Sequence, residues 1–190
     1  MTSIKQINTK LCRTAALLCV CLAGVISVQA DDNAQRGQLV SADYKFVKEA
    51  AMGSMMEVDL GKLATQKSSN PSVQQFGQRM VTDHGKAGEK LKEIVTKNGG
   101  TLPAEISSGQ QKAIDKLSKL TGEDFDKEYV SMMVKDHKKD LKEFQHAAKH
   151  AENTDLKEFA ESTAQIIQEH LTMIEGIQKQ LGSAKTAGVQ

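Results

Sequence analysis

The chain has 190 residues, which suits one domain and excludes most multidomain enzymes. Its 25 Lys and Arg residues nearly balance 24 Asp and Glu residues, so net charge gives no basis for expecting a nucleic-acid partner. Aromatic residues make up 4%, Trp is absent and Pro occurs twice, a composition that favours an all-α fold over a β-sandwich or barrel.

The first 30 residues have the pattern of a secretory signal peptide. Lys5, Lys10 and Arg13 precede an apolar run over residues 15–28, and the Val28-Gln29-Ala30 sequence predicts cleavage after Ala30. The run is shorter than the roughly 20 residues of a membrane-spanning helix. We therefore expect a periplasmic or secreted protein with no transmembrane segment in the mature chain. The three cysteines, at positions 12, 19 and 21, all lie in this leader, so no disulfide is expected.

The rest of the chain is punctuated as long helices. Residues 31–41 predict a flexible lead-in, and residues 183–190 a flexible tail. Four long helices are predicted over residues 42–66, 71–97, 121–151 and 154–182, with a short helix over residues 109–120. Two short links and one long connection indicate a four-helix bundle over residues 42–182.

Capping residues mark the predicted helix ends. Asn70 is a good N-cap and Pro71 suits the first helical position, where its missing N–H costs nothing. Asn98-Gly99-Gly100 predicts a left-handed helix end. Thr121, followed by an acid three residues later, and Thr154 are the predicted N-caps of the last two long helices.

Each of the four long helices carries one ionisable residue inside its apolar stripe. Helical wheels place Glu57, His84, His137 and His170 on the faces that should be buried, with Asp83 at the edge of its stripe. From the rise of 1.5 Å per residue, all four lie near the middle of the bundle whichever way the two hairpins face each other. We therefore expect these four side chains to meet at one interior point.

Such a cluster predicts a metal site. A buried charge without a partner costs several kcal/mol, so these groups must pair, stay neutral or bind a cation. Neutral imidazoles with one carboxylate suit zinc, iron or copper, and helix bundles build such sites from inward side chains. The sequence predicts one transition-metal ion held by Glu57, His84, His137 and His170, with no organic cofactor.

Two other interpretations of the same residues remain open. The four could form a metal-free Glu–His hydrogen-bond network that fixes helix register in a structural or interaction module. A small redox or peroxide-handling enzyme is the third interpretation. No catalytic motif identifies an enzyme, because the sequence has no Gly-flanked Ser after a predicted strand and no Gly-rich phosphate loop.

Other metal sites are weaker predictions. Glu143 and His146 have the Glu-x-x-His spacing of di-iron bundles, but they lie on the side of their helix opposite His137. His146 and His150 form an i, i+4 pair that is better explained as solvated. Methionines 80, 133 and 173 lie within four residues of an imidazole and would suit Cu(I), although Met in a helical core usually fills space.

A family resemblance rests on four segments, at residues 46–64, 69–87, 125–144 and 155–174. They carry Glu57, the Asp83-His84 pair, Phe125-Asp126 with Tyr129, His137 and His170-Leu171. In these residues the chain resembles the bacterial domain-of-unknown-function family 4142 over residues 42–182. The resemblance implies a ferritin-like helical bundle exported to the cell envelope, and it supplies no settled activity.

These observations lead to one expectation about function. We expect an exported bundle that binds one transition metal and serves metal handling or envelope stress. No nucleic acid is expected as a partner; an envelope protein or a second copy of the chain is the kind of partner that such a bundle would take.

Overall fold

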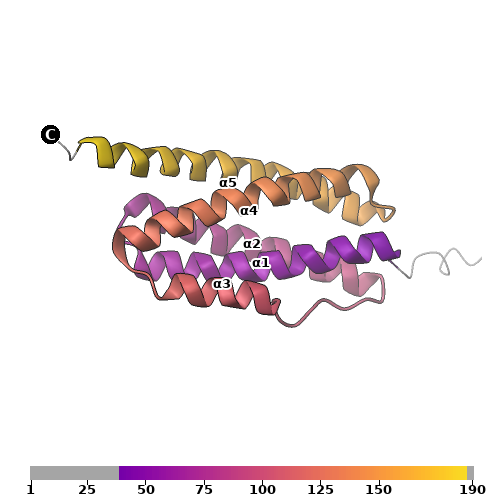
Figure 1. Ribbon diagram of the computed structural model, residues 1–190. Helices are drawn as coiled ribbons and strands as arrows, with labels where there is room; N and C mark the ends of the chain where they lie inside the picture. Colours follow the sequence, from indigo (N-terminus) through magenta and orange to yellow (C-terminus); the bar gives the residue numbers. More distant parts are fainter. Residues whose placement is uncertain (1–38, 188–190) are drawn as a thin grey trace, which may run out of the picture. The chain divides into compact units, whose positions relative to one another are not determined.

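The computed structural model describes residues 39–187, all within the unit formed by residues 32–190. Figure 1 shows five helices in this part of the chain: α1 (Ser41–Lys67), α2 (Pro71–Lys97), α3 (Ser108–Ser118), α4 (Gly122–His150) and α5 (Thr154–Ala187). The predicted all-α class is confirmed. The predicted leader and most of the lead-in, residues 1–38, lie outside the described residues.

The four long helices form two hairpins. α1 packs along α2 and α4 along α5, while α2 also contacts α5 and α1 contacts α4. The four helices thus surround a common interior (Figure 1). The long connection between the hairpins contains α3, which lies against α1 and α4. This is the predicted bundle with one long connection; the ferritin-like designation stays a prediction.

Local hydrogen bonds explain where α2 begins and ends. The Asn70 side chain accepts the backbone N–H groups of Ser72 (2.9 Å) and Val73 (3.4 Å), and Pro71 occupies the first turn, as predicted. At the other end, Gly99 has a φ of 71°, which favours Gly because no Cβ is present to clash. The loops on both sides of α2 are therefore determined by the local sequence.

Two predicted caps differ from the structure. Thr121 precedes α4 but makes no side-chain capping hydrogen bond, since the chain turns there through Gly122, which has a φ of 56°. The N-terminus of α5 is capped by Asn153 rather than Thr154, because Asn153 Oδ1 accepts the N–H of Leu156 at 3.0 Å. Both helices still begin within one residue of the expected position.

The C-terminal helix is longer than predicted. α5 continues to Ala187, whereas the sequence predicts its end at Gly182. Within the described residues, positive φ is found at Gly99 and Gly122 but not at Gly182, so Gly182 does not form a left-handed cap. Residues 183–187, part of the predicted tail, are therefore helical and belong to α5.

The buried apolar residues form two separate clusters. One, the α3-side cluster, contains Leu60, Phe76, Met80, Tyr129, Met133 and Ile174 among others. The second, the Phe144 cluster, contains Val47, Leu91, Phe144, Phe159 and Ile167 among others. On α2, α4 and α5 the predicted histidine lies in sequence between a residue of one cluster and a residue of the other. A polar layer therefore interrupts the apolar interior.

Two glycines allow α1 and α2 to approach each other closely. A Cβ added to Gly61 would lie 2.6 Å from the carbonyl oxygen of Gly77. A Cβ added to Gly77 would lie 2.7 Å from the carbonyl oxygen of Gly61 and 2.8 Å from the Cβ of Ala64. Because helical backbone cannot rotate away as a side chain can, any larger residue here must separate the two helices.

We expect Gly77→Ala to lower the free energy of unfolding by about 1–3 kcal/mol, the usual cost of overpacking. Gly176 in α5 is the matched control, since an added Cβ there meets no atom within 4 Å. Gly176→Ala should raise the stability by up to about 1 kcal/mol, because Ala favours helix over Gly. Urea denaturation of both variants tests this, and a stabilised Gly77→Ala protein would contradict it.

Candidate metal centre

The structure brings the four predicted site residues together in the polar layer. Glu57 is 4% exposed, His84 is 6% exposed, and His137 and His170 are completely buried. The three imidazole ring centroids lie 5.4 to 5.8 Å apart. One residue comes from each long helix, so the site exists only where α1, α2, α4 and α5 meet.

The three histidines have the geometry of a metal-ligand set. One nitrogen from each of His84, His137 and His170 lies within 4.8 Å of those from the other two. Among the described residues, this is the group of His, Cys, Asp and Glu side chains that could hold a metal ion. Glu57, the fourth predicted ligand, is not part of this group.

Each imidazole uses one nitrogen in a contact with a fixed partner. The contacts are His84 Nδ1 with Glu57 Oε2 (2.8 Å), His137 Nδ1 with the Met133 carbonyl oxygen (2.9 Å), and His170 Nε2 with Asp83 Oδ2 (2.9 Å). The other nitrogen of each ring is buried and has no hydrogen-bond partner: Nε2 of His84, Nε2 of His137 and Nδ1 of His170. Three buried nitrogens are thus left without a partner from the described residues.

Two residues of α1 hold His84 in place. The Ser54 hydroxyl donates a 2.6 Å hydrogen bond to the backbone carbonyl of His84, and Glu57 contacts its ring. Glu57 Oε1 lies 3.5 Å from Nδ1 of His137 and has no hydrogen-bond partner. Glu57 therefore contacts the Nδ1 edges of two rings, whereas the unpartnered nitrogens of these rings are both Nε2.

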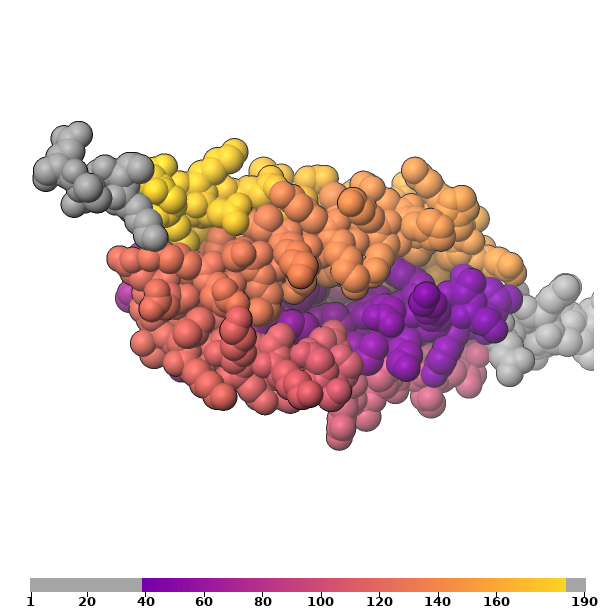
Figure 2. Space-filling model, in the orientation of Figure 1, coloured from indigo at the N-terminus to yellow at the C-terminus, as the bar shows by residue number. Residues whose placement is uncertain are grey.

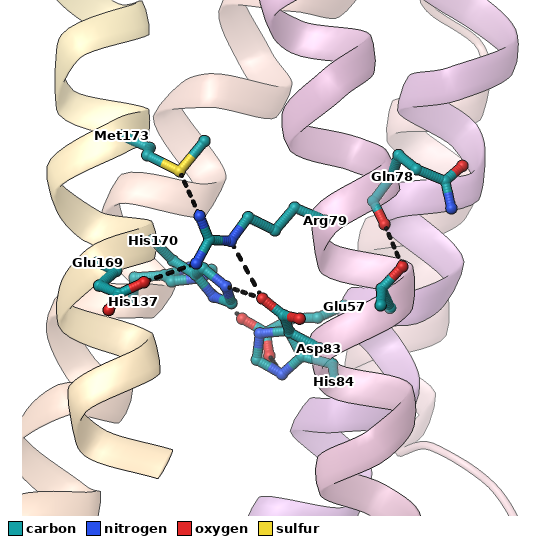
Figure 3. A network of polar contacts seen from close by, with 10 residues as sticks. Glu57, Gln78, Arg79, Asp83, His84, His137, Glu169, His170 and Met173 are labelled. Carbon is teal, nitrogen blue, oxygen red and sulfur yellow. Dashed lines mark hydrogen bonds and ion pairs between the residues drawn. The ribbon is translucent and has the colours of Figure 1, made fainter. Parts of the chain in front are cut away.

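A charged network closes the side of the site near His170 (Figure 3). Asp83, which contacts His170, also accepts a hydrogen bond from Arg79 Nε at 3.1 Å. The same guanidinium donates to Glu169 Oε2 at 2.6 Å and to the Met173 sulfur at 3.4 Å. Met173 is therefore engaged by Arg79, while Met80 and Met133 pack in the α3-side cluster.

Burial and neighbouring charges set the protonation of the site. Burial lowers the pKa of His84, but the charge and hydrogen bond of Glu57 outweigh burial and raise it. Burial raises the pKa of Glu57, and the three imidazoles together reverse this and lower it. For His137 and His170 burial prevails, and the pKa of His170 falls to about 4. The layer thus favours one ion pair and two neutral imidazoles.

Wheel positions alone do not identify the polar groups around the four residues. Asp140 lies one turn beyond His137, and burial together with the charge of Glu57 raises its pKa to about 8. Tyr129 and Asp126 each have a buried oxygen without a hydrogen-bond partner. Asp140 follows the predicted ligand His137 by three residues, and this helical spacing is the sequence signal that could have identified it. The ring centroids of His146 and His150 lie 4.5 Å apart, with the rings tilted by 37°, on the exposed side of α4 and away from this cluster.

Comparison with known proteins places the chain in a family. The family model for the domain of unknown function DUF4142 matches residues 28–177. The chain belongs to this family. The match confirms the resemblance carried by the site residues, and it assigns no activity to this DUF4142 protein.

The solved structures contain a similar fold. A DUF305 fragment from Deinococcus radiodurans resembles this DUF4142 protein with a TM-score of 0.67 at 12% sequence identity. The similarity covers 75% of this chain and 99% of that chain, and at such low identity it shows the helical fold alone. No curated protein matches the sequence. None of the helices in the described residues is long and apolar enough to span a membrane.

We expect the burial of His170 to cost the metal-free protein stability as the pH drops from about 6.5 to about 4. An unfolded His titrates near 6.5, but folded His170 resists protonation until about pH 4, so protons stabilise the unfolded chain in this window. His137 acts in the same direction. The raised folded pKa values of Asp136 and Asp140 act oppositely in this window, and that of His84 acts oppositely above it. The lowered pKa values of Glu57 and Asp83 cause a further loss of stability at lower pH.

Denaturation of wild type and His170→Gln at several pH values measures this effect. Lowering the pH from 6.5 to 4 should favour the stability of the variant over that of wild type by on the order of 3 kcal/mol, the value of a shift from 6.5 to about 4. His146→Gln, a change on the exposed face of α4, should keep the wild-type pH dependence. An equal dependence of the unfolding free energy on pH in wild type and His170→Gln would contradict the lowered pKa of His170.

Proposed function

We propose that this protein binds one divalent transition-metal ion through His84 Nε2, His137 Nε2 and His170 Nδ1. The proposed role is metal handling in the cell envelope, including under stress, in the periplasm after removal of the leader. The single observation that supports the proposal is that each ring has one nitrogen held by a fixed partner and one that is buried and unpartnered. Metal-binding imidazoles typically have this arrangement, since the outer partner orients the ring.

The unpartnered nitrogens also argue against the metal-free alternative. A hydrogen-bond network that only fixed helix register would be expected to satisfy its buried polar atoms, because each unsatisfied one costs about 1–3 kcal/mol. Here the unpartnered atoms include one nitrogen on each of the three rings and Oε1 of Glu57. A cation in the layer would remove this cost at all three nitrogens.

The ligand type and spacing favour zinc, iron or copper. Imidazole nitrogens suit these three metals, and three protein ligands leave a further coordination position for water or another group. Zinc–nitrogen bonds of about 2.1 Å place tetrahedral ligands about 3.4 Å apart. One nitrogen from each ring lies within 4.8 Å of one from each of the other two rings, so binding would draw the rings closer together.

Glu57 fits the role of a positioning residue better than that of a fourth ligand. Its Oε2 contacts Nδ1 of His84, and its Oε1 lies nearest Nδ1 of His137. In this position the carboxylate fixes ring orientation and makes the His84 imidazole a stronger donor. Asp83 has the corresponding contact with His170.

Protein purified without an affinity tag is expected to contain about one transition-metal ion per chain, measured by elemental mass spectrometry. After chelation, Zn²⁺ at a free concentration of 100 times Kd should raise the unfolding free energy by about 2.7 kcal/mol. His137→Gln should abolish the gain, whereas His146→Gln should retain it. Protein that is metal-free as purified and gains no thermal stability from zinc, iron, copper or manganese would overturn the proposal.

The role of Glu57 can be tested separately. We expect Glu57→Gln to weaken Co²⁺ binding by about 10–100-fold, the usual effect of losing an outer partner, while the visible spectrum of the bound Co²⁺ stays unchanged. Asp83→Asn should have a similar effect. A changed spectrum in Glu57→Gln would instead identify Glu57 as a direct ligand, because the ligand field depends on the atoms bound to the metal.

A further inference from the structure

Two adjoining cavities lie between the surface and His84. The outer cavity, of about 220 Å³, is bounded by α1, α3 and α4, and its lining includes the exposed Glu49 and Lys139. The inner cavity, of about 20 Å³, is lined by Glu57 and His84 among others. Both cavities include Glu49, Gly53, Glu57 and Asp140 in their walls. An inner space of this size holds about one water molecule, and thus one cation without its full hydration shell.

The walls of these cavities are rich in carboxylates. Glu49 and Glu57 come from α1, and Asp136 and Asp140 come from α4, with Lys139 as the one cationic side chain in the outer lining. Burial, followed by the charge of Glu57, raises the pKa of both aspartates. A carboxyl group with a raised pKa tends to keep its proton, and a cation beside it would favour loss of that proton.

Glu57 connects these cavities to the histidines. Its Oε1 is buried, has no hydrogen-bond partner and belongs to a side chain that lines both cavities. Its Oε2 contacts His84 at 2.8 Å. A cation that reached Glu57 would therefore lie beside the side chain that contacts the His84 ring of the polar layer.

Side-chain contacts close the site near His170. The guanidinium of Arg79 lies over Asp83 and is tied to Glu169 (Figure 3). An ion could pass on that side only if these contacts broke. In Figure 2 the face that carries the outer cavity is visible, with α1 in indigo between α4 and α3.

We propose that these two cavities form the path by which a divalent metal ion enters, with Asp140 and Glu57 as successive carboxylates along it. The inference rests on the proposed metal binding at the three histidines and adds how the ion reaches them. Carboxyl oxygens of Glu49, Glu57, Asp136 and Asp140 offer an arriving cation contacts along this path. The metal ion would use the same path to bind and to dissociate. Blocking the path should therefore slow association and dissociation equally and leave the affinity unchanged.

A steric block at Gly53 tests the path with little disturbance of the fold. An added Cβ at Gly53 meets no atom within 4 Å, so a leucine there would project into space shared by the two cavities. Gly176 has equally open surroundings on α5 and lines neither cavity. Gly176→Leu is therefore the matched control for the change of residue type within a helix.

The measurement is stopped-flow binding of Co²⁺ to chelated protein, with equilibrium titration of the same samples. Gly53→Leu should slow association and dissociation by about tenfold or more with an unchanged Kd, because access then needs a conformational opening. Gly176→Leu should bind at the wild-type rate. Asp140→Asn should slow association several-fold because it removes a carboxyl oxygen that an arriving ion can contact, whereas Glu161→Gln, the matched acid-to-amide change at an exposed position of α5, should not.

The outcomes separate the path from the proposed function. Wild-type protein that takes up no Co²⁺ overturns the metal site itself. Wild-type protein that binds Co²⁺, with Gly53→Leu and Asp140→Asn both loading at the wild-type rate, overturns the path alone. If Gly53→Leu does not fold, the comparison of Asp140→Asn with Glu161→Gln decides the question.

Discussion

The burial of three imidazoles and one carboxylate in an otherwise apolar bundle is the constraint on which the rest of this structure depends. Moving such groups out of water is costly unless each polar atom finds a partner. The helices meet part of this need with Glu57, Asp83 and a backbone carbonyl. One nitrogen on each ring remains without a partner. Only part of the polar layer therefore has hydrogen-bond partners. In such a layer a cation that bound the remaining nitrogens would stabilise the fold.

The surrounding bundle holds this layer in position. Apolar clusters lie on both sides of it, and their burial stabilises the helices that carry the site. α1 is tied to α2 by the contact between Gly61 and Gly77 and by the hydrogen bond from Ser54 to His84. Since Glu57 lies on the same helix as Ser54, the close packing of these two helices also fixes the contact of Glu57 with His84. Stability and site geometry thus depend on the same interface.

The two sides of the polar layer differ in the side chains that line them. Near His170, Arg79 spans Asp83 and Glu169 and closes the site. Beside Glu57, the lining of the two cavities includes carboxyl groups from α1 and α4. α3 forms part of the outer cavity through residues of its first turns, so the long connection between the hairpins contributes to the approach as well as to the fold. A symmetric pair of hairpins would lack this feature.

The sequence by itself determined the helices, their order and the residues of the polar layer, because apolar periodicity, Asn70 with Pro71, and Gly99 act through neighbouring residues. The same periodicity placed Glu57 and the three histidines on inward faces. Tertiary structure alone decided which atoms meet: that Glu57 contacts Nδ1 of His84, that Asp83 reaches His170, and that acids of α1 and α4 share a cavity. It also corrected the caps at Thr121 and Thr154 and the end of α5. These features depend on how helices pack and on backbone angles at single residues, and a helical wheel contains neither.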